Sequence, residues 1–176
     1  MKTAILAALA MLGSPASAAR LRDGSHDFDF AAGKWTTQVT VFKDPFGDPT
    51  KFTSMTGTKV ARPLWGGRGW IEEIEAGTGA DHWQGATIFL YDPVAHQWSQ
   101  TYADGDTGRM DAVAGVGQWH EGTLEFHWQQ PVDGRMTMMR GVWKDFTPTA
   151  HTYEIDRSND GGRSWHAAFI ARVTRA

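Results

Sequence analysis

Two charged side chains lie in the middle of segments with strand composition, where they could act inside a protein. Glu73 lies on the same strand face as Ile71, and Arg140 on the face of Met138. A charge turned into an interior needs a partner or a ligand, and an arginine can hold a carboxylate through two hydrogen bonds. Charges on strands more often face solvent and mark no site. The pattern makes Arg140, ahead of Glu73, the first candidate for a ligand contact.

Polar and aromatic residues on other predicted strands extend this candidate site. Gln100 and Tyr102 share a face with Trp98, and Trp128 offers an apolar wall. The expected ligand-binding residues are Arg140, Glu73, Gln100, Tyr102, Trp128 and Trp143.

No catalytic motif accompanies these residues. The sequence contains no G-x-S-x-G elbow, H-E-x-x-H pair, phosphate-binding P-loop or G-x-G-x-x-G segment opening a helix. The seven histidines are scattered, and no two share a strand face at the spacing of metal ligands. Asp104, Asp106 and Asp111 resemble part of a calcium loop, but the terminal Glu of that loop is missing. We therefore predict neither a catalytic residue nor a metal site.

Composition excludes several other classes of protein. The 176 residues contain no cysteine, which rules out disulfide scaffolds, thiolate metal sites and a lipid-anchored cysteine. A net charge of −3 argues against nucleic acid and anionic membranes as partners. Nine Trp and nine Phe in so short a chain indicate an aromatic core or an aromatic-lined cavity.

The N-terminus has the pattern of a secretory signal peptide. Lys2 is followed by an apolar run from Ala4 to Leu12 and by the small residues 16–18. A membrane-spanning helix needs about 20 apolar residues, and no stretch of that length follows. We expect residues 1–18 to be cleaved, leaving a soluble periplasmic or secreted protein that starts at Ala19 and is not inserted in a membrane.

The remaining residues, 19–176, read as a single all-β domain. About ten strand candidates are separated by turn signals every 8–15 residues or so, without a helical period. They span residues 34–42, 52–60, 70–74, 86–91, 98–103, 110–116, 123–129, 135–144, 152–157 and 164–172. Closing such a sheet removes its edges. We predict a single antiparallel up-and-down barrel of about 8–10 strands, wide enough to enclose a small ligand.

Three local motifs support this architecture without supplying chemistry. Gly33 precedes Trp35 by two residues at the first strand, as in lipocalin-like barrels whose Trp plugs the closed end. Arg172 or Arg175 could stack over that Trp. Residues 158–165 match an Asp-box hairpin turn, and residues 91–98 form a second hairpin signature with Trp98.

Taken in order, these motifs resemble a family of secreted bacterial proteins of unknown function. The resemblance rests on F-D-F-x-x-G-x-W, Y-D-P-x-x-x-x-W, R-x-x-W, the Asp-box-like turn and a closing Arg, and it covers most of residues 26–175. It implies a lipocalin- or calycin-like barrel, distantly similar to the haem-binding barrels of the nitrobindin type. Haem is therefore one cofactor to test, although no histidine here aligns with their axial ligand.

We therefore predict an exported barrel that binds a small, partly apolar ligand in an aromatic-lined cavity. The alternatives are a calycin-type hydrolase, isomerase or cyclase that uses Glu73 as acid/base and Arg140 as its electrophilic partner, and a purely structural barrel with a filled interior. Motifs account for Trp35, Trp98 and Trp165. The ligand should be sought near the other six, Trp65, Trp70, Trp83, Trp119, Trp128 and Trp143. Ligand identity and oligomeric state stay open.

Overall fold

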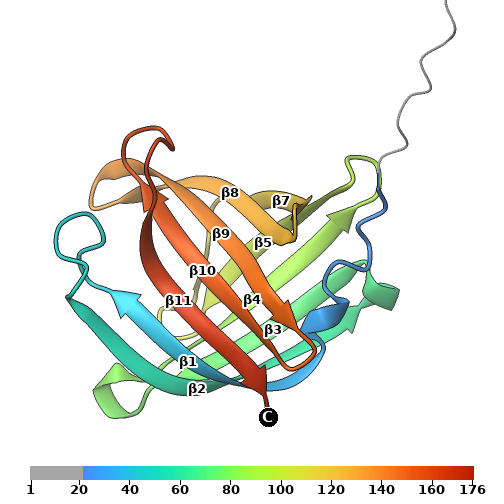
Figure 1. The fold of residues 1–176 in the computed structure, drawn as a ribbon, viewed down its shortest axis with the longest axis horizontal. Coiled ribbons are helices and arrows are strands. Elements are labelled where there is room, and N and C mark those ends of the chain that lie inside the picture. Colours follow the sequence, from blue (N-terminus) through green and yellow to red (C-terminus); the bar gives the residue numbers. More distant parts are fainter. Residues whose placement is uncertain (1–21) are drawn as a thin grey trace, which may run out of the picture.

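A computed structural model describes residues 22–176, and the predicted signal peptide lies outside this range. Ten strands form the barrel (Figure 1). Their bounds are β1 Gly33–Phe42, β2 Phe52–Leu64, β3 Gly69–Ala76, β4 Trp83–Asp92, β5 Gln97–Asp104, β7 Gly115–His120, β8 Thr123–Val132, β9 Arg135–Thr147, β10 Ala150–Ser158 and β11 His166–Arg175. The two-residue strand β6 (Arg109–Met110) only extends β5. Three short 3₁₀ turns complete the described chain, at Asp29–Ala31, Trp65–Gly67 and Gly79–Asp81.

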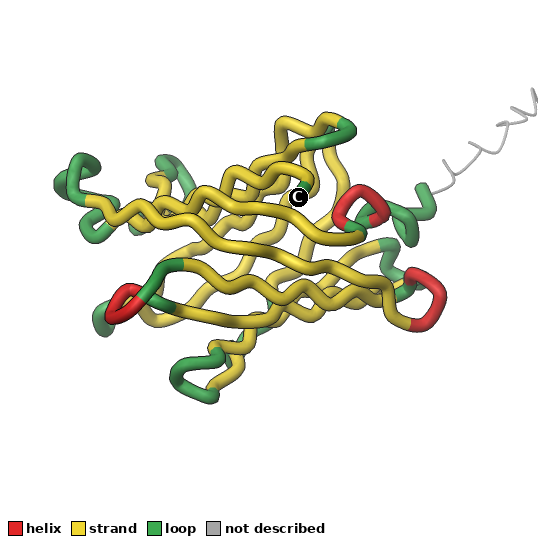
Figure 2. The backbone as a smooth tube through the Cα atoms, turned by 90° about the horizontal axis from the view of Figure 1, so that it is seen from below, coloured by secondary structure: helices red, strands yellow, loops and turns green. Residues whose placement is uncertain are grey.

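Each barrel strand pairs antiparallel with the next one along the chain, and β11 pairs with β1. The pairing of β4 with β5 and of β5 with β7 leaves none of the ten strands with a free edge. Seen from below, the strands wrap around a common interior, with turns at both ends (Figure 2). The prediction of a closed all-β, up-and-down barrel is confirmed.

The aromatic side chains fill much of the interior because they recur at alternate strand positions, which point to one face. On β8, Leu124 and Phe126 are fully buried and Trp128 follows on the same face. Register aligns Leu124 with Trp143 of β9, which is also buried. These side chains belong to a cluster that includes Phe28 and Trp98.

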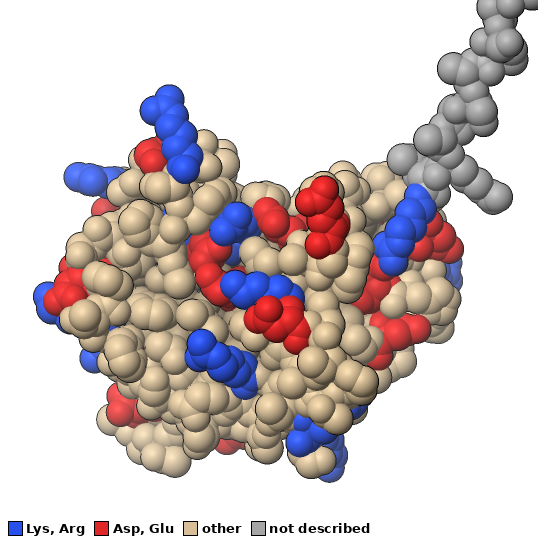
Figure 3. Space-filling view, viewed as in Figure 1, with Lys and Arg blue, Asp and Glu red and all other residues tan. Residues whose placement is uncertain are grey.

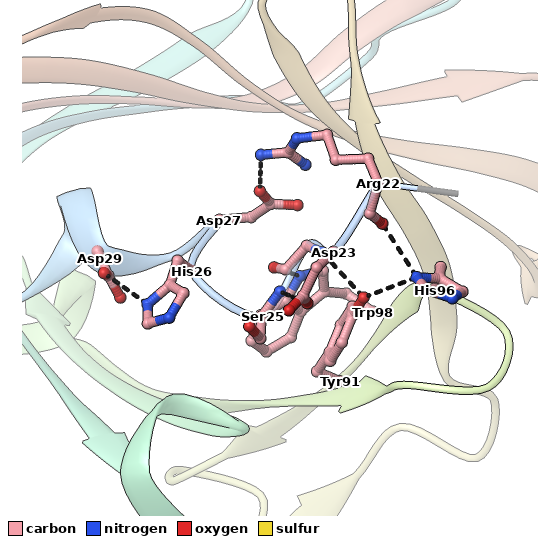
Figure 4. Close-up of polar contacts among 10 residues, drawn as sticks. Arg22, Asp23, Ser25, His26, Asp27, Asp29, Tyr91, His96 and Trp98 are labelled. Atoms are coloured by element: carbon pink, nitrogen blue, oxygen red, sulfur yellow. Dashed lines mark hydrogen bonds and ion pairs between the residues drawn. The ribbon is translucent and has the colours of Figure 1, made fainter. Parts of the chain in front are cut away.

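The segment before β1 closes one end of the barrel. Phe28 is fully buried and packs against Phe89, with ring centroids 4.3 Å apart, and edge-on against Trp98 at 4.8 Å. The backbone N–H of Gly24 donates to the hydroxyl of Tyr91 at 2.9 Å, and the indole N–H of Trp98 donates to the Gly24 carbonyl at 2.9 Å (Figure 4). These bonds seat the segment across the strand ends.

The same end carries the predicted Trp plug. Trp35 is buried, and its indole N–H donates to the Ala31 carbonyl at 2.8 Å. The guanidinium of Arg175 lies 3.7 Å from the centre of the Trp35 ring, so Arg175 is the closing arginine. Gly33 has φ +103°, and a Cβ there would lie 2.9 Å from Arg175, which gives the Gly of this motif a structural reason.

The Asp-box turn between β10 and β11 is also present. Asp160 accepts hydrogen bonds from the backbone N–H groups of Arg163 and Ser164, each at 3.0 Å. The backbone N–H and the hydroxyl of Ser164, followed by the Ser158 hydroxyl, hold the pKa of Asp160 below its usual value. Gly161 and Gly162 take the positive φ that the turn requires. The turn is local structure, as expected.

One predicted strand is misplaced. The segment 110–116 does not form a strand of its own: β6 ends at Met110 and β7 begins at Gly115. Residues 111–114 between them are an exposed connection, and β7 continues to His120. Within residues 22–176 no helix is long and apolar enough to span a membrane.

Candidate functional site

A cavity of about 530 Å³ occupies the barrel interior. Its lining includes Val41 near the end of β1, Asp104 at the end of β5 and Arg157 near the end of β10. These strand ends lie opposite the end that Phe28 and Trp35 close. The cavity therefore has a mouth at one end of the barrel and a floor toward the other.

The walls of the cavity are mainly aromatic and aliphatic. Aromatic side chains come from six strands, namely Trp83, Tyr102, Trp128, Trp143, Tyr153 and Phe169, and aliphatic ones include Ile74, Ile155 and Val173. Tyr153 stacks on Trp143 with ring centroids 4.4 Å apart. Such walls suit the apolar part of a ligand.

A buried charged cluster lies at the floor. The Nζ of Lys59 is 2.9 Å from Oε2 of Glu72 and 2.9 Å from Nε2 of His151. It also lies 4.6 Å from the centre of the Trp143 ring, a cation–π contact. Lys59 is only 1% exposed and Glu72 7%. Burial of this kind is tolerated when the charges neutralise each other.

Sheet register produces the ion pair. Glu72 of β3 is aligned with Ala61 of β2, two positions beyond Lys59, so both charged side chains fall on the inner face as diagonal neighbours. Trp70 and Ile74 flank Glu72 on that face, and the pattern along β3 is apolar, acidic, apolar.

The surroundings of the cluster change its protonation. Burial lowers the pKa of Lys59, and the Glu72 carboxylate partly offsets that effect. Burial, followed by the nearby Lys59 and Arg175 charges, lowers the pKa of His151 to about 3. His151 is therefore neutral at physiological pH and adds no charge to the Lys59–Glu72 pair.

Several polar atoms on the cavity wall have no hydrogen-bond partner among the described residues. They are Gln100 Oε1, Trp143 Nε1 and Arg157 Nε. Glu72 Oε2 has the ammonium of Lys59 as its partner, at 2.9 Å. Buried polar atoms are rarely left without partners, so this wall is suited to an occupant that supplies them.

Gln100 and Tyr153 link opposite sides of the floor. The amide N–H of Gln100 donates to the Tyr153 hydroxyl at 3.5 Å, a long contact that leaves the amide oxygen free. Burial raises the pKa of Tyr153, which stays protonated. The hydroxyl proton of Tyr153 is therefore available to the cavity.

The mouth carries charges of both signs. Asp104, Asp106 and Asp111 line it on one side, and Arg157 lines it from β10. Burial and these three carboxylates raise the pKa of Tyr102 to about 12. Asp104 also accepts backbone hydrogen bonds from Asp106 and Thr107 at 2.9 Å each, so it organises the turn.

Four of the six expected ligand-binding residues line this cavity: Gln100, Tyr102, Trp128 and Trp143. Of the other unexplained tryptophans, Trp83 also lines it. Trp70 is buried in the core, Trp119 stacks on Phe146, and Trp65 is 68% exposed. The structure brings together the aromatic part of the predicted site.

Arg140 and Glu73 do not lie at the cavity, and their expected interior position is wrong. Arg140 is on the outer face of β9, where its Nε and Nη2 donate to Oδ2 of Asp156 at 3.1 and 2.7 Å. Its guanidinium also lies 4.7 Å from the centre of the Trp165 ring. Charges of both signs alternate on this face of the molecule (Figure 3). Glu73 is exposed because its neighbour Glu72 takes the inner position.

The polar cavity residues that sequence reasoning missed include Lys59, Glu72, Tyr153 and Arg157. The alternation of side chains along a strand could have identified some of them. Tyr153, Ile155 and Arg157 share one face of their strand, and Trp70, Glu72 and Ile74 share one face of theirs. Lys59 gives no such signal, because its strand neighbours Gly57 and Ala61 are small.

The residues present do not fit a histidine-ligated haem. All seven histidines lie within residues 22–176, and none lines the cavity. His151, the buried one, turns its Nε2 to Lys59 instead. In the described chain no group of three or more His, Asp or Glu side chains is arranged to hold a metal ion.

Comparison with known proteins shows the fold and no more. No family model matches the chain, and no curated protein matches it. Among solved structures, the chain is similar to the S-type phycobiliprotein lyase CPES from Guillardia theta, with a TM-score of 0.57 and 9% identity. The match covers 88% of this chain and 93% of the lyase. The two proteins share a calycin-like barrel.

Proposed function

We propose that this barrel binds one small, partly apolar ligand in its interior. The observation that carries the proposal is a cavity of about 530 Å³ with aromatic walls and buried, unpartnered polar atoms at its floor. Ligand sites typically have about 300–1,000 Å³ of space, largely apolar walls and a few polar groups that fix orientation. The likeness in fold to a phycobiliprotein lyase also supports a small-molecule occupant.

Catalysis by the acid and arginine named from sequence finds no support in the geometry. Glu73 and Arg140 are on the outer face of different strands, β3 and β9, away from the cavity. Arg140 is already engaged by Asp156. The proposal is therefore binding.

A cavity-filling substitution tests this function. Ile155 lines the cavity, and Ile170, half-buried on the neighbouring strand β11, does not. The Ile155→Trp variant should lose most of the small molecule that co-purifies with the protein, because the larger ring occupies the same space. Native mass spectrometry of protein purified from cells would measure the bound fraction.

The matched control is Ile170→Trp, which adds the same volume outside the cavity and should keep its occupant. Circular dichroism would check that both variants fold. A protein that carries no small molecule, and whose melting temperature no member of a broad metabolite and lipid panel raises, would contradict the proposal.

We also propose that the protein is exported and processed before Ala19, on the basis of the charged, apolar and small-residue pattern of residues 1–18. Fractionation of the native host with intact-mass measurement would test it. A mass corresponding to residues 19–176 in the periplasmic or secreted fraction is expected, and full-length protein confined to the cytoplasm would contradict it.

A further inference from the structure

We propose that the floor of the cavity recognises an uncharged polar head that both donates and accepts hydrogen bonds, such as a primary amide or a lactam. The inference rests on the proposed function and names the chemical class of its ligand. Carboxylate and ammonium heads on the same apolar body should bind much more weakly.

The first step is the charge of the floor. Lys59 and Glu72 are 2.9 Å apart, both are more than nine-tenths buried, and together they carry no net charge. That balance holds whichever of the two atoms carries the shared proton. His151 is the third member of the cluster. Its Nε2 lies 2.9 Å from Lys59 Nζ, and its neutral ring adds no charge.

The second step is the set of free hydrogen-bonding atoms. Gln100 Oε1 is an acceptor without a donor among the described residues, and Trp143 Nε1 is a donor without an acceptor. Glu72 is 7% exposed, Gln100 8% and Trp143 1%. Contacts tie the three together, because Lys59 touches both Glu72 and Trp143, and Tyr153 touches both Trp143 and Gln100.

A head with N–H and C=O groups matches this set, and a fully charged head does not. A carboxylate offers only acceptors, which leaves Gln100 Oε1 unsatisfied and adds a negative charge beside Glu72. An ammonium offers only donors, which leaves the Trp143 N–H unsatisfied and adds a positive charge beside Lys59. Either charge would be buried without compensation, which is costly.

The charged mouth does not change this preference. Its carboxylates and Arg157 carry opposite signs, and Asp104, Asp106 and Asp111 lie where a loop meets solvent, so water screens them. The head is selected at the floor, where water is excluded.

Three probes with a common naphthalene body test the inference: 1-naphthaleneacetamide, 1-naphthaleneacetate and 2-(1-naphthyl)ethylamine. Isothermal titration calorimetry at pH 7 would compare their affinities for the wild-type protein. The amide should bind at least about tenfold more tightly than either charged probe, since one unsatisfied buried group already costs that much.

Variants at the floor locate the head. Gln100→Leu should lower the affinity for the amide about tenfold and change that for the charged probes little. Ser99→Ala, on the opposite face of β5, is the matched control and should leave all three affinities unchanged. Gln100→Glu places a second carboxylate at the floor, so the ammonium probe should become the tightest binder.

An acetate that binds as tightly as the amide, and loses its affinity in Arg157→Gln, would overturn the inference and place the head at the mouth. Failure of all three probes, with a co-purified occupant still displaced by Ile155→Trp, would overturn the inference and leave the proposed function standing. A carboxylate or ammonium head on that occupant, bound at the floor, would also overturn it.

Discussion

The Lys59–Glu72–His151 cluster combines three ionisable side chains that are all buried in the barrel. Lys59 makes contacts with both of the other two at 2.9 Å and with the faces of Trp143 and Trp35. Removal of one partner from a buried pair leaves an uncompensated charge, which is usually strongly destabilising. The cluster therefore fixes a polar floor within an otherwise aromatic interior.

His151 should make stability depend on pH. Its folded-state pKa is about 3, against an ordinary value of 6.5, because burial and the Lys59 and Arg175 charges oppose its protonation. Between these two values the unfolded chain binds a proton that the folded chain does not, so stability falls as the pH falls. The contribution is about 1.4 kcal/mol per pH unit.

Urea unfolding of the wild type and of His151→Gln between pH 6 and pH 4 measures this contribution. In the variant, the free energy of unfolding should fall by about 1.4 kcal/mol less per unit of pH decrease than in the wild type. The reason is that Gln does not titrate, while its amide oxygen can still accept from Lys59. His120→Gln, at an exposed position on β7, should keep the wild-type slope. Equal slopes for the wild type and His151→Gln would show that His151 does not titrate as described.

At the residue scale, the aromatic part of the site could be predicted and the charged part could not. Trp128 follows from the strict alternation of Leu124 and Phe126, and Gln100 from that of Trp98. The sequence Ile71-Glu72-Glu73-Ile74 has no such alternation, so either glutamate could face inward. The register of β3 against β2 places Glu72, beside Lys59, on the inner face. Register cannot be read from a single sequence.

At the scale of elements, turn chemistry carried most of the prediction. Gly-containing and Asp-Pro turns placed nearly every strand to within a few residues, and the turn before β11 has the Asp160 hydrogen bonds and positive-φ glycines that were expected. The error at 110–116 arose where apolar residues such as Val113 continue through an exposed loop. The segment 22–32 was not predicted as a plug, because its short 3₁₀ turn has no periodic signal.

At the scale of the molecule, the barrel has one end built for stability and one for access. The closed end holds Phe28, Trp35 and the hydrogen bonds of Gly24 to Tyr91 and Trp98. The open end has the cavity mouth and the loops between β1 and β2 and between β5 and β7. The mouth can therefore vary without loss of the packing that closes the barrel.

This asymmetry predicts different costs for one substitution at the two ends. Phe28→Ala should lower the free energy of unfolding by about 3–5 kcal/mol, because it removes a fully buried ring from among Phe89, Trp98 and Trp143. Phe46→Ala, in the loop after β1, should cost less than about 1 kcal/mol, because that ring is 39% exposed. Denaturant unfolding monitored by both tryptophan fluorescence and circular dichroism would measure the two variants. Because the strands form one closed sheet, Phe28→Ala should shift a single transition with both probes together. Similar losses for Phe28→Ala and Phe46→Ala would mean that the N-terminal segment does not close the barrel in solution.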